Sequence, residues 1–332
     1  MTIDRYIAEQ PAVLAAVLRE TPAQLASLPR LESGETVYLV GAGSSMNALI
    51  AVAPTFERLL PNPFRLRSPL AFVEDAAAGP LRPGLAILLS QTGTSSTVIE
   101  ALDAARAAGL RTIGVTAEQG SPFGQAIESR LIMPIGEQKA GPKTKGYTAS
   151  VLSLLMLAHA LAEKEIEQPD LSDLAAGIEQ ARTAAMDMAE AFPDADFFLV
   201  LGRGRHASTA LEASLKIAEM TGIPAAGYDT EEAFHGRLHG LTPRSVVFVL
   251  SSTAKDRELA AIAGRVLGEL GIAARIFDLP AAAVLPEFDL IAGVLPFQWL
   301  GRELALRKSI APEAMRYPGL SQRLKIKTGN EP

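Results

Sequence analysis

The chain has 332 residues, of which 48% are hydrophobic and 20% are charged. This globular balance excludes disordered, collagen-like and disulfide-stapled proteins, and the length suggests about two domains. The formal charge of −6 and the lack of a long basic run argue against nucleic-acid binding, and the absence of cysteine excludes disulfides, thiol nucleophiles and cysteine-rich metal sites.

The predicted elements alternate short β-branched runs with longer helical patterns, which is typical of an α/β fold with parallel sheets. The N-terminus lacks the apolar core of a signal peptide. The longest uncharged apolar stretch, 146–162, is too short for a membrane span and indicates a buried helix. We therefore expect a soluble cytoplasmic protein with no membrane segment. In chain order, helices are expected over 6–28, 45–60, 95–108, 148–164, 171–191, 207–220 and 255–270, and strands over 37–40, 85–89, 112–115, 130–134, 197–201, 246–250 and 274–277.

Sequence landmarks recur at a nearly constant spacing. The run VGAG at 40–43 recurs as LGRG at 201–204, and LSQT at 89–92 recurs as LSST at 250–253, both 161 residues later. This spacing predicts a duplicated α/β unit. Only the first copy has a glycine, Gly93, where the second has Ala254, so we expect the copies to bind ligands differently. The expected parts are an N-terminal helix over 1–19, a first domain over 20–165, a second over 190–320 and a tail over 321–332.

The segment SQTGTSS at 90–96 follows a predicted buried strand and opens a predicted helix. Helix N-terminal amides and hydroxyl groups suit an anion, and Gly93 lets the backbone approach it, so this loop is a candidate site for a phosphate monoester. An N-cap followed by a turn is the structural alternative, because Ser and Thr are favoured there in any case.

Two further glycine loops open helices, at 41–45 (GAGSS) and 202–207 (GRGRHA). In the first, Met46 stands where a dinucleotide fingerprint needs its third glycine. The second fits that fingerprint better, but Asp229 comes late for the acid that would bind the ribose, so a nicotinamide enzyme is the weaker alternative. The sequence has no P-loop motif.

The candidate acids and bases lie in the second copy. Glu212, Lys216 and Glu219 are spaced to lie on one face of a helix, as either a solvated salt-bridge stripe or a catalytic group. His235 and His239 have a metal-helix spacing, but no third ligand is evident and Gly236 would weaken a helix there. Proton transfer by His235 is the better interpretation.

Together, five segments resemble the sugar isomerase (SIS) domain family. They are GAGSS at 41–45, SQTGTSS at 90–96, AGPKTKGYT at 140–148, GRGRHASTALEASLKIAEMTG at 202–222 and EEAFHGR at 231–237. The resemblance runs from about residue 20 to 328. It is to tandem-SIS proteins, namely the isomerase half of glucosamine-6-phosphate synthase and stand-alone phosphosugar isomerases, deaminases and deglycases. It implies two flavodoxin-like domains, each a parallel sheet in a three-layer αβα arrangement.

The resemblance also implies roles for the matched residues. Glu219 would move a proton between C1 and C2 of the sugar, and His235 would assist ring opening, in a homodimer that shares its active sites. The 6-phosphate would be bound by Ser90, Gln91, Thr92 and Ser95, and the sugar would be lined by Gly43, Ser44, Ser45, Lys143, Thr144, Glu212 and Lys216. No cofactor and no metal is expected.

Three positions depart from the family pattern. Lys143 replaces a serine, and Arg237 replaces the proline of His-Gly-Pro. In the synthase, a lysine near the C-terminus forms an imine with the ketose. The nearest matching position in this sequence is Arg323, and Lys325 could replace that lysine only with a shift of register.

The leading hypothesis is an enzyme acting on a 6-phosphorylated hexose or amino sugar by aldose–ketose isomerisation, with or without release of ammonia. The alternatives are a fructosamine-6-phosphate deglycase and a non-catalytic sugar-phosphate sensor.

Overall fold

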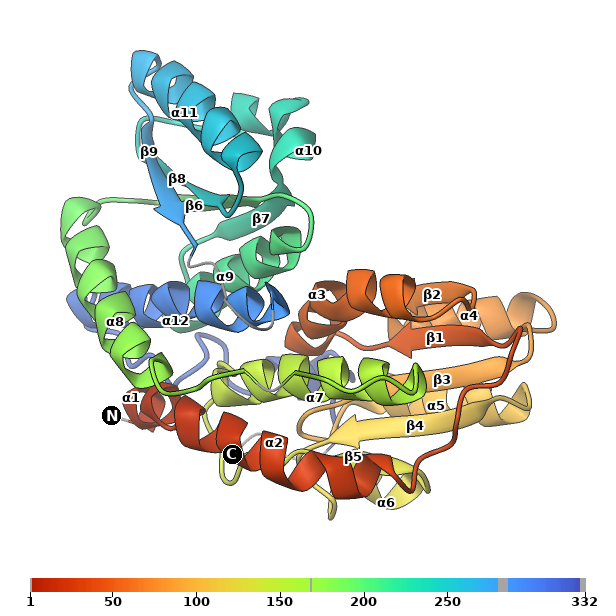
Figure 1. Ribbon diagram of the computed structural model, residues 1–332. Coiled ribbons are helices and arrows are strands. Elements are labelled where there is room, and N and C mark those ends of the chain that lie inside the picture. Colours follow the sequence, from red (N-terminus) through yellow and green to blue (C-terminus); the bar gives the residue numbers. More distant parts are fainter. Residues whose placement is uncertain (1, 168, 280–285, 329–332) are drawn as a thin grey trace. The chain divides into compact units, whose positions relative to one another are not determined.

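The computed structural model describes residues 2–167, 169–279 and 286–328 (Figure 1). Residues 280–285 of the expected second domain and 329–332 of the expected tail therefore lie outside the described part. The chain forms two compact units. The N-terminal unit comprises Ala12–Lys139, Lys145–Gln168 and Tyr317–Pro332; the C-terminal unit comprises Met1–Pro11, Ala140–Thr144 and Pro169–Arg316. Residues 2–11 thus belong to the unit built mainly from the second half of the sequence, and residues 317–328 belong to the unit built mainly from the first half.

A parallel sheet with the strand order β2-β1-β3-β4-β5 forms the centre of the N-terminal unit. Its central strands β1 and β3 are buried along their whole length, as their continuous aliphatic runs predict for strands covered on both faces. The strands are β1 (Thr36–Val40), β2 (Phe64–Arg67), β3 (Gly84–Leu89), β4 (Arg111–Thr116) and β5 (Arg130–Ile132).

Helices cover both faces of this sheet (Figure 1). On one face, α4, α5 and α6 bury Phe72, Leu102 and Phe123 against Tyr38 and Leu88 of the sheet. On the other face α3 packs along α7, which is buried over most of its length as expected for 146–162. The helices are α2 (Gln10–Leu25), α3 (Ser44–Leu59), α4 (Pro69–Ala78), α5 (Ser96–Ala107), α6 (Pro122–Ala126), α7 (Lys145–Leu161) and α13 (Leu320–Arg323).

The C-terminal unit repeats this plan with a parallel sheet in the order β7-β6-β8-β9. Helices α10 and α11 pack on one face of the sheet, α9 and α12 pack on the other, and α8 packs on α12. The elements are α1 (Thr2–Ala8), α8 (Leu174–Ala191), β6 (Phe197–Gly202), α9 (His206–Thr221), β7 (Ala225–Asp229), α10 (Thr230–Phe234), the 3-10 helix η1 (Arg237–Gly240), β8 (Ser245–Ser251), α11 (Ala254–Glu269), β9 (Ala273–Asp278), the 3-10 helix η2 (Pro286–Phe288) and α12 (Asp289–Arg307).

The four strands of the C-terminal sheet repeat the order of the first four strands of the N-terminal sheet, which has β5 as an additional edge strand. In each, the first strand of the unit leads through a helix to the edge on one side, and the next central strand leads to the other side. This confirms the duplicated three-layer α/β fold predicted from the sequence. It also creates one topological switch point per unit, between β1 and β3 and between β6 and β8, where open α/β sheets bind ligands at the carboxyl ends of their strands.

The N-terminal helix differs from its prediction. The single helix expected over 6–28 is two helices, α1 and α2, separated at Glu9. Pro11 explains the break because it has no amide hydrogen to donate to the carbonyl of Ile7. The side chain of Gln10 donates to that carbonyl instead, at 3.0 Å.

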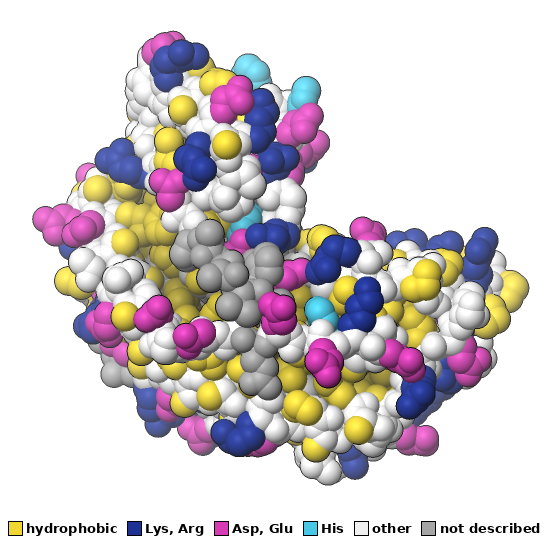
Figure 2. Space-filling view, in the orientation of Figure 1, with side chains coloured by type: hydrophobic (Ala, Val, Ile, Leu, Met, Phe, Trp, Pro, Cys, Tyr) yellow, Lys and Arg dark blue, Asp and Glu magenta, His cyan; other side chains and the backbone are white. Residues whose placement is uncertain are grey.

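On the face drawn in Figure 2, basic side chains are interspersed with acidic ones, in line with the small net charge. No helix within residues 2–167, 169–279 and 286–328 is long and apolar enough to cross a bilayer.

Candidate active site

The switch point of the N-terminal unit is bordered by two loops, at 41–43 after β1 and at 90–95 after β3. Gly43 precedes α3 with a φ of +59°, a backbone conformation that favours glycine, and it has no side chain to cap the amides of the first turn. The switch point is thus bordered by a helix start and a hydroxyl-rich loop.

Gly93 shapes the loop after β3. Its φ is +64°, and a Cβ added there would lie 1.8 Å from the Oγ of Ser121. Its amide donates to the carbonyl of Ser90 at 3.1 Å, and its carbonyl accepts from the amide of Phe123 at 3.0 Å. Glycine is therefore required both for the turn and for its close packing against the start of α6.

The polar side chains of this loop have different environments. Ser90 is buried, and the hydroxyls of Thr92 and Thr94 lie 2.9 Å apart. Ser95 is the N-cap of α5 and accepts from the amide of Val98 at 3.4 Å. The hydroxyl of Ser95 therefore has the structural capping role that was the alternative interpretation of this segment, and this bond uses one of its acceptor positions.

Gln91 is fixed by a residue that the sequence did not single out. Its Nε2 donates to the Oε1 of Gln138 at 3.1 Å, and the same oxygen accepts the amide of Gly146 at 3.0 Å. A Cβ at position 146 would lie 2.0 Å from the Nε2 of Gln91. Gln138 and Gly146 thus hold the Gln91 side chain, and only a contact across 47 residues reveals Gln138.

The C-terminal tail docks on the same loop. Ser95 and Lys327 form an antiparallel bridge, and the carbonyls of Lys325 and Ile326 accept from the hydroxyl and the amide of Ser96 at 2.7 and 3.1 Å. The side chains of Lys325 and Arg323 are exposed. Lys325 therefore lies in the segment along the start of α5, and Arg323 ends α13 just before that segment.

In the C-terminal unit, α9 carries the three charged residues expected on one face. The Nζ of Lys216 lies 3.4 Å from Glu212 and forms an ion pair with Glu219. Glu212 and Lys216 are fully buried, whereas the Glu219 side chain is 18% exposed. The salt-bridge stripe on a solvated face is therefore wrong: α9 holds a buried cluster that reaches solvent through Glu219.

This cluster keeps Lys216 charged. Burial alone would lower the pKa of Lys216, but the nearby carboxylates of Glu212 and Glu219 outweigh it, so that the pKa lies above its usual value. Two carboxylates and one ammonium leave the cluster with one excess negative charge when all three are ionised. The carboxylate nearest to solvent is that of Glu219.

His235 follows α10 as its C-cap and is exposed, and Gly236 ends the helix with a φ of +120°. His235 and His239 are therefore not on one continuous helix. The guanidinium of Arg237 lies 4.6 Å from the ring centre of Tyr228, so Arg237 is held over an aromatic face.

The remaining expected site residues lie at helix starts and in a linking segment. Ser44 and Ser45 begin α3, with the amide of Ser45 donating to the carbonyl of Ala42 at 3.2 Å. Lys143 and Thr144 belong to the C-terminal unit, where the ammonium of Lys143 donates to the carbonyl of Ala140 at 2.9 Å and Thr144 is buried. Within the part of the chain that the structure describes, no three His, Asp or Glu residues are grouped so as to hold a metal ion.

Comparisons with known proteins agree on one family. The sequence profile of the SIS domain matches residues 30–160 and 193–277. Glutamine–fructose-6-phosphate aminotransferase (isomerizing) of Pyrobaculum aerophilum is 29% identical over 340 residues, covering 94% of this chain but 56% of that protein. The chain thus spans about half the length of this curated relative.

Solved structures share the fold. Glucosamine-6-phosphate deaminase of Thermotoga maritima superposes with a TM-score of 0.81 at 24% identity, covering 96% of this chain and 98% of that one. Tagatose-6-phosphate ketose/aldose isomerase of Escherichia coli superposes with a TM-score of 0.74 at 16% identity, covering 96% of this chain and 97% of that one. These likenesses establish the tandem α/β architecture.

Proposed function

The chain belongs to the SIS domain family, and from this premise we propose that it is an enzyme acting on a 6-phosphorylated hexose or amino sugar by proton transfer between C1 and C2. The buried cluster of Glu212, Lys216 and Glu219 carries this proposal. Burying charged groups is costly and is weak evidence for stability, so such a cluster beside solvent indicates a functional group.

Glu219 is the proposed base. One carboxylate can take the proton from one carbon of an open-chain sugar and return it to the neighbouring carbon. Lys216 would hold Glu219 in place, and its positive charge would favour the negative charge that develops on the substrate oxygen. His235 would assist opening of the sugar ring, contributed by a second copy in a homodimer.

The crevice beside Gly93 is the proposed phosphate site. Ser90, Gln91 and Thr92 would bind the 6-phosphate, with Ser44 and Ser45 near the sugar. The geometry that supports this is a glycine-built turn, a fixed glutamine and hydroxyls beside two helix starts. Anchoring a remote phosphate lets its binding energy orient the reacting carbons.

Incubation with glucosamine 6-phosphate, fructose 6-phosphate and a fructosamine 6-phosphate tests the reaction, with ammonia, the sugar products and free amine measured separately. Solvent deuterium should enter at C1 or C2 of a turned-over substrate. Turnover of none of the three, with phosphosugar binding retained, would support the sensor instead and contradict the proposal.

Glu219→Gln tests the base. We expect a loss of roughly 10²–10⁴-fold in turnover with phosphate binding retained. Glu258→Gln is the matched control, because Glu258 pairs with Lys255 at the same spacing but on an exposed surface, at 3.0 Å. An unchanged rate in Glu219→Gln would refute the assignment.

Deglycation of a fructosamine 6-phosphate is the second candidate. Arg323 stands nearest to the position of the synthase's imine-forming lysine, and arginine cannot form that imine. A fructosamine already carries its amine, so this reaction does not depend on a tail lysine. Release of free amine in the same assay, without ammonia, would favour it.

A further inference from the structure

The switch point of the C-terminal unit has the same topology as the proposed phosphate site but a different loop. After β8, only residues 252 and 253 precede α11, whereas residues 90–95 separate β3 from α5. After β6, Arg203 lies in the glycine loop that leads to α9. The second crevice therefore places a guanidinium beside a helix start.

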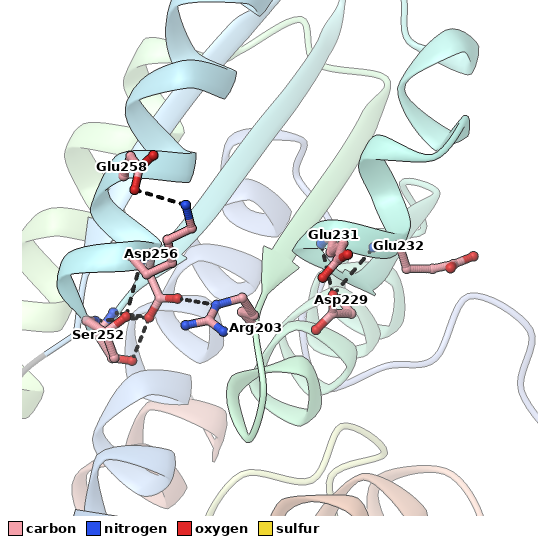
Figure 3. Close-up of polar contacts among 9 residues, drawn as sticks. Arg203, Asp229, Glu231, Glu232, Ser252, Asp256 and Glu258 are labelled. Carbon is pink, nitrogen blue, oxygen red and sulfur yellow. Dashed lines mark hydrogen bonds and ion pairs between the residues drawn. The ribbon is translucent and has the colours of Figure 1, made fainter.

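A carboxylate of the chain itself occupies this position (Figure 3). The Oδ1 of Asp256 accepts from the Nε of Arg203 at 2.8 Å. Its Oδ2 accepts from the amide of Thr253 at 2.9 Å and from the hydroxyl and the amide of Ser252 at 3.0 and 3.2 Å. Asp256 is 6% exposed. One buried carboxylate thus takes four hydrogen bonds.

These four donors are the types that bind a phosphate group: two amides at a helix start, a hydroxyl and a guanidinium. The surroundings add further negative charge. The hydrogen bond and the charge of Asp256 raise the pKa of Arg203, and the charges of Asp229 and Glu231, on the other side of Arg203 from Asp256, raise it further. A second anion at Arg203 would meet the carboxylate of Asp256 directly, together with the longer-range negative charge of Asp229 and Glu231.

We infer that Asp256 is an internal anion that closes the second crevice, so that this unit does not accept a phosphomonoester in the place where the N-terminal unit is proposed to bind one. Its hydrogen bonds outweigh burial and lower the pKa of Asp256 to about 2. The carboxylate therefore stays ionised at neutral pH, and closure does not depend on pH there.

Replacing Asp256 tests the inference with inorganic phosphate as the probe. Equilibrium dialysis at constant ionic strength should show that Asp256→Ser binds one more equivalent of phosphate than the wild type. Asp256→Ser/Arg203→Gln should lose that equivalent. A folded Asp256→Ser protein, judged by circular dichroism, that binds no additional phosphate would overturn the inference.

A second variant keeps the test decisive if Asp256→Ser does not fold. Arg203→Gln in the otherwise unchanged chain should leave the number of bound phosphates unchanged, because Arg203 already binds Asp256. Loss of one equivalent in that variant would mean that the crevice is open. The proposed phosphate site is scored separately by Thr92→Ala, so its failure would not be confused with failure at Asp256.

Discussion

The two switch points have the same position in equivalent sheets, but the chemical groups beside them differ. The one beside Gly93 carries hydroxyls, amides and a fixed glutamine, whereas the one beside Arg203 contains a carboxylate with four hydrogen bonds. The repeated strand order therefore gives each unit one switch point, and the side chains at the strand ends differ between the two.

The helices α3 and α9, which follow the first strand of each unit, differ in their buried charges: α9 has them and α3 does not. At the repeat spacing of 161 residues, Glu212 and Lys216 of α9 correspond to Ala51 and Thr55 of α3, which are buried and uncharged. The N-terminal unit thus lacks the buried charged cluster at these positions, and the C-terminal unit has the carboxylate of Asp256 where the N-terminal unit is proposed to bind phosphate. At the same spacing the third member of the cluster, Glu219, corresponds to Arg58, so none of the three positions keeps its residue type between the copies.

The largest expected effect tests the charged half. Lys216→Met should lower the free energy of unfolding by about 3–5 kcal/mol, because it leaves Glu212 and Glu219 without their cation. Urea unfolding of Lys255→Met is the control, since that exposed pair contributes less than about 1 kcal/mol. Equal losses of stability in both variants would show that the buried Lys216 contributes no more to stability than an exposed lysine.

The pH dependence of this loss has a defined sign. The folded state raises the pKa of Lys216, so its stabilising contribution is complete below the unfolded value of about 10.4 and disappears as pH rises through the folded pKa. The difference in the free energy of unfolding between the wild type and Lys216→Met should therefore become smaller only in strongly alkaline solution.

The next effect compares the two loops directly. Gly93→Ala should cost about 1–3 kcal/mol and weaken phosphate binding, because φ is positive and Ser121 occupies the space for a Cβ. Ala254→Gly at the corresponding position should cost no more than about 1 kcal/mol and leave phosphate binding unchanged. Scanning calorimetry measures the stability of each variant, and titration calorimetry with inorganic phosphate measures its binding. Equal losses of phosphate binding in Gly93→Ala and Ala254→Gly would contradict the proposed difference between the two loops.

Asp256→Asn tests whether the ionised carboxylate of Asp256, which also forms a capping box with Thr253 at the start of α11, stabilises the fold. Loss of the charged acceptor should cost about 1–3 kcal/mol at neutral pH. Because the folded pKa of Asp256 is about 2, its contribution is present above the unfolded value of about 3.9 and is lost as pH falls toward 2. Asp173→Asn is the control, because Asp173 precedes α8 without a side-chain capping bond among the described residues. A pH-independent difference would contradict the assignment.

The smallest effect concerns the tail. Ser96→Ala should weaken tail docking by about 0.5–1.5 kcal/mol, since it removes the hydrogen bond to the carbonyl of Lys325. Trypsin should then cleave after Lys325 and Lys327 faster. Ser27→Ala removes a similar hydroxyl–carbonyl bond away from the tail and should leave cleavage unchanged. Equal cleavage rates in wild type and Ser96→Ala would show that this bond does not hold the tail.

The sequence predicted the central strands because their aliphatic runs need burial on both faces. The edge strands β2 and β7 were not predicted, since FRLR is charged and AAGYD is poor in β-branched residues. Helix α12 was also not predicted: it is buried on nearly every side, so its sequence lacks an amphipathic period, and Pro296 lies inside it.

In the candidate site, too, local sequence patterns were informative, whereas contacts between distant residues were not predicted. Residues close in sequence, such as Glu212, Lys216 and Glu219, were placed correctly by helical spacing. By contrast, Gln138 and Gln91 come from separate loops, and Arg203 and Asp256 come from a loop and the first turn of α11, which only the strand order brings together.

A crystal structure of the protein with bound inorganic phosphate tests the central claim most directly. The account predicts phosphate at the loop 90–95, within hydrogen-bonding distance of Ser90 or Thr92, with the Arg203–Asp256 pair unchanged. Phosphate on Arg203 with Asp256 displaced, while the loop 90–95 binds none, would contradict it.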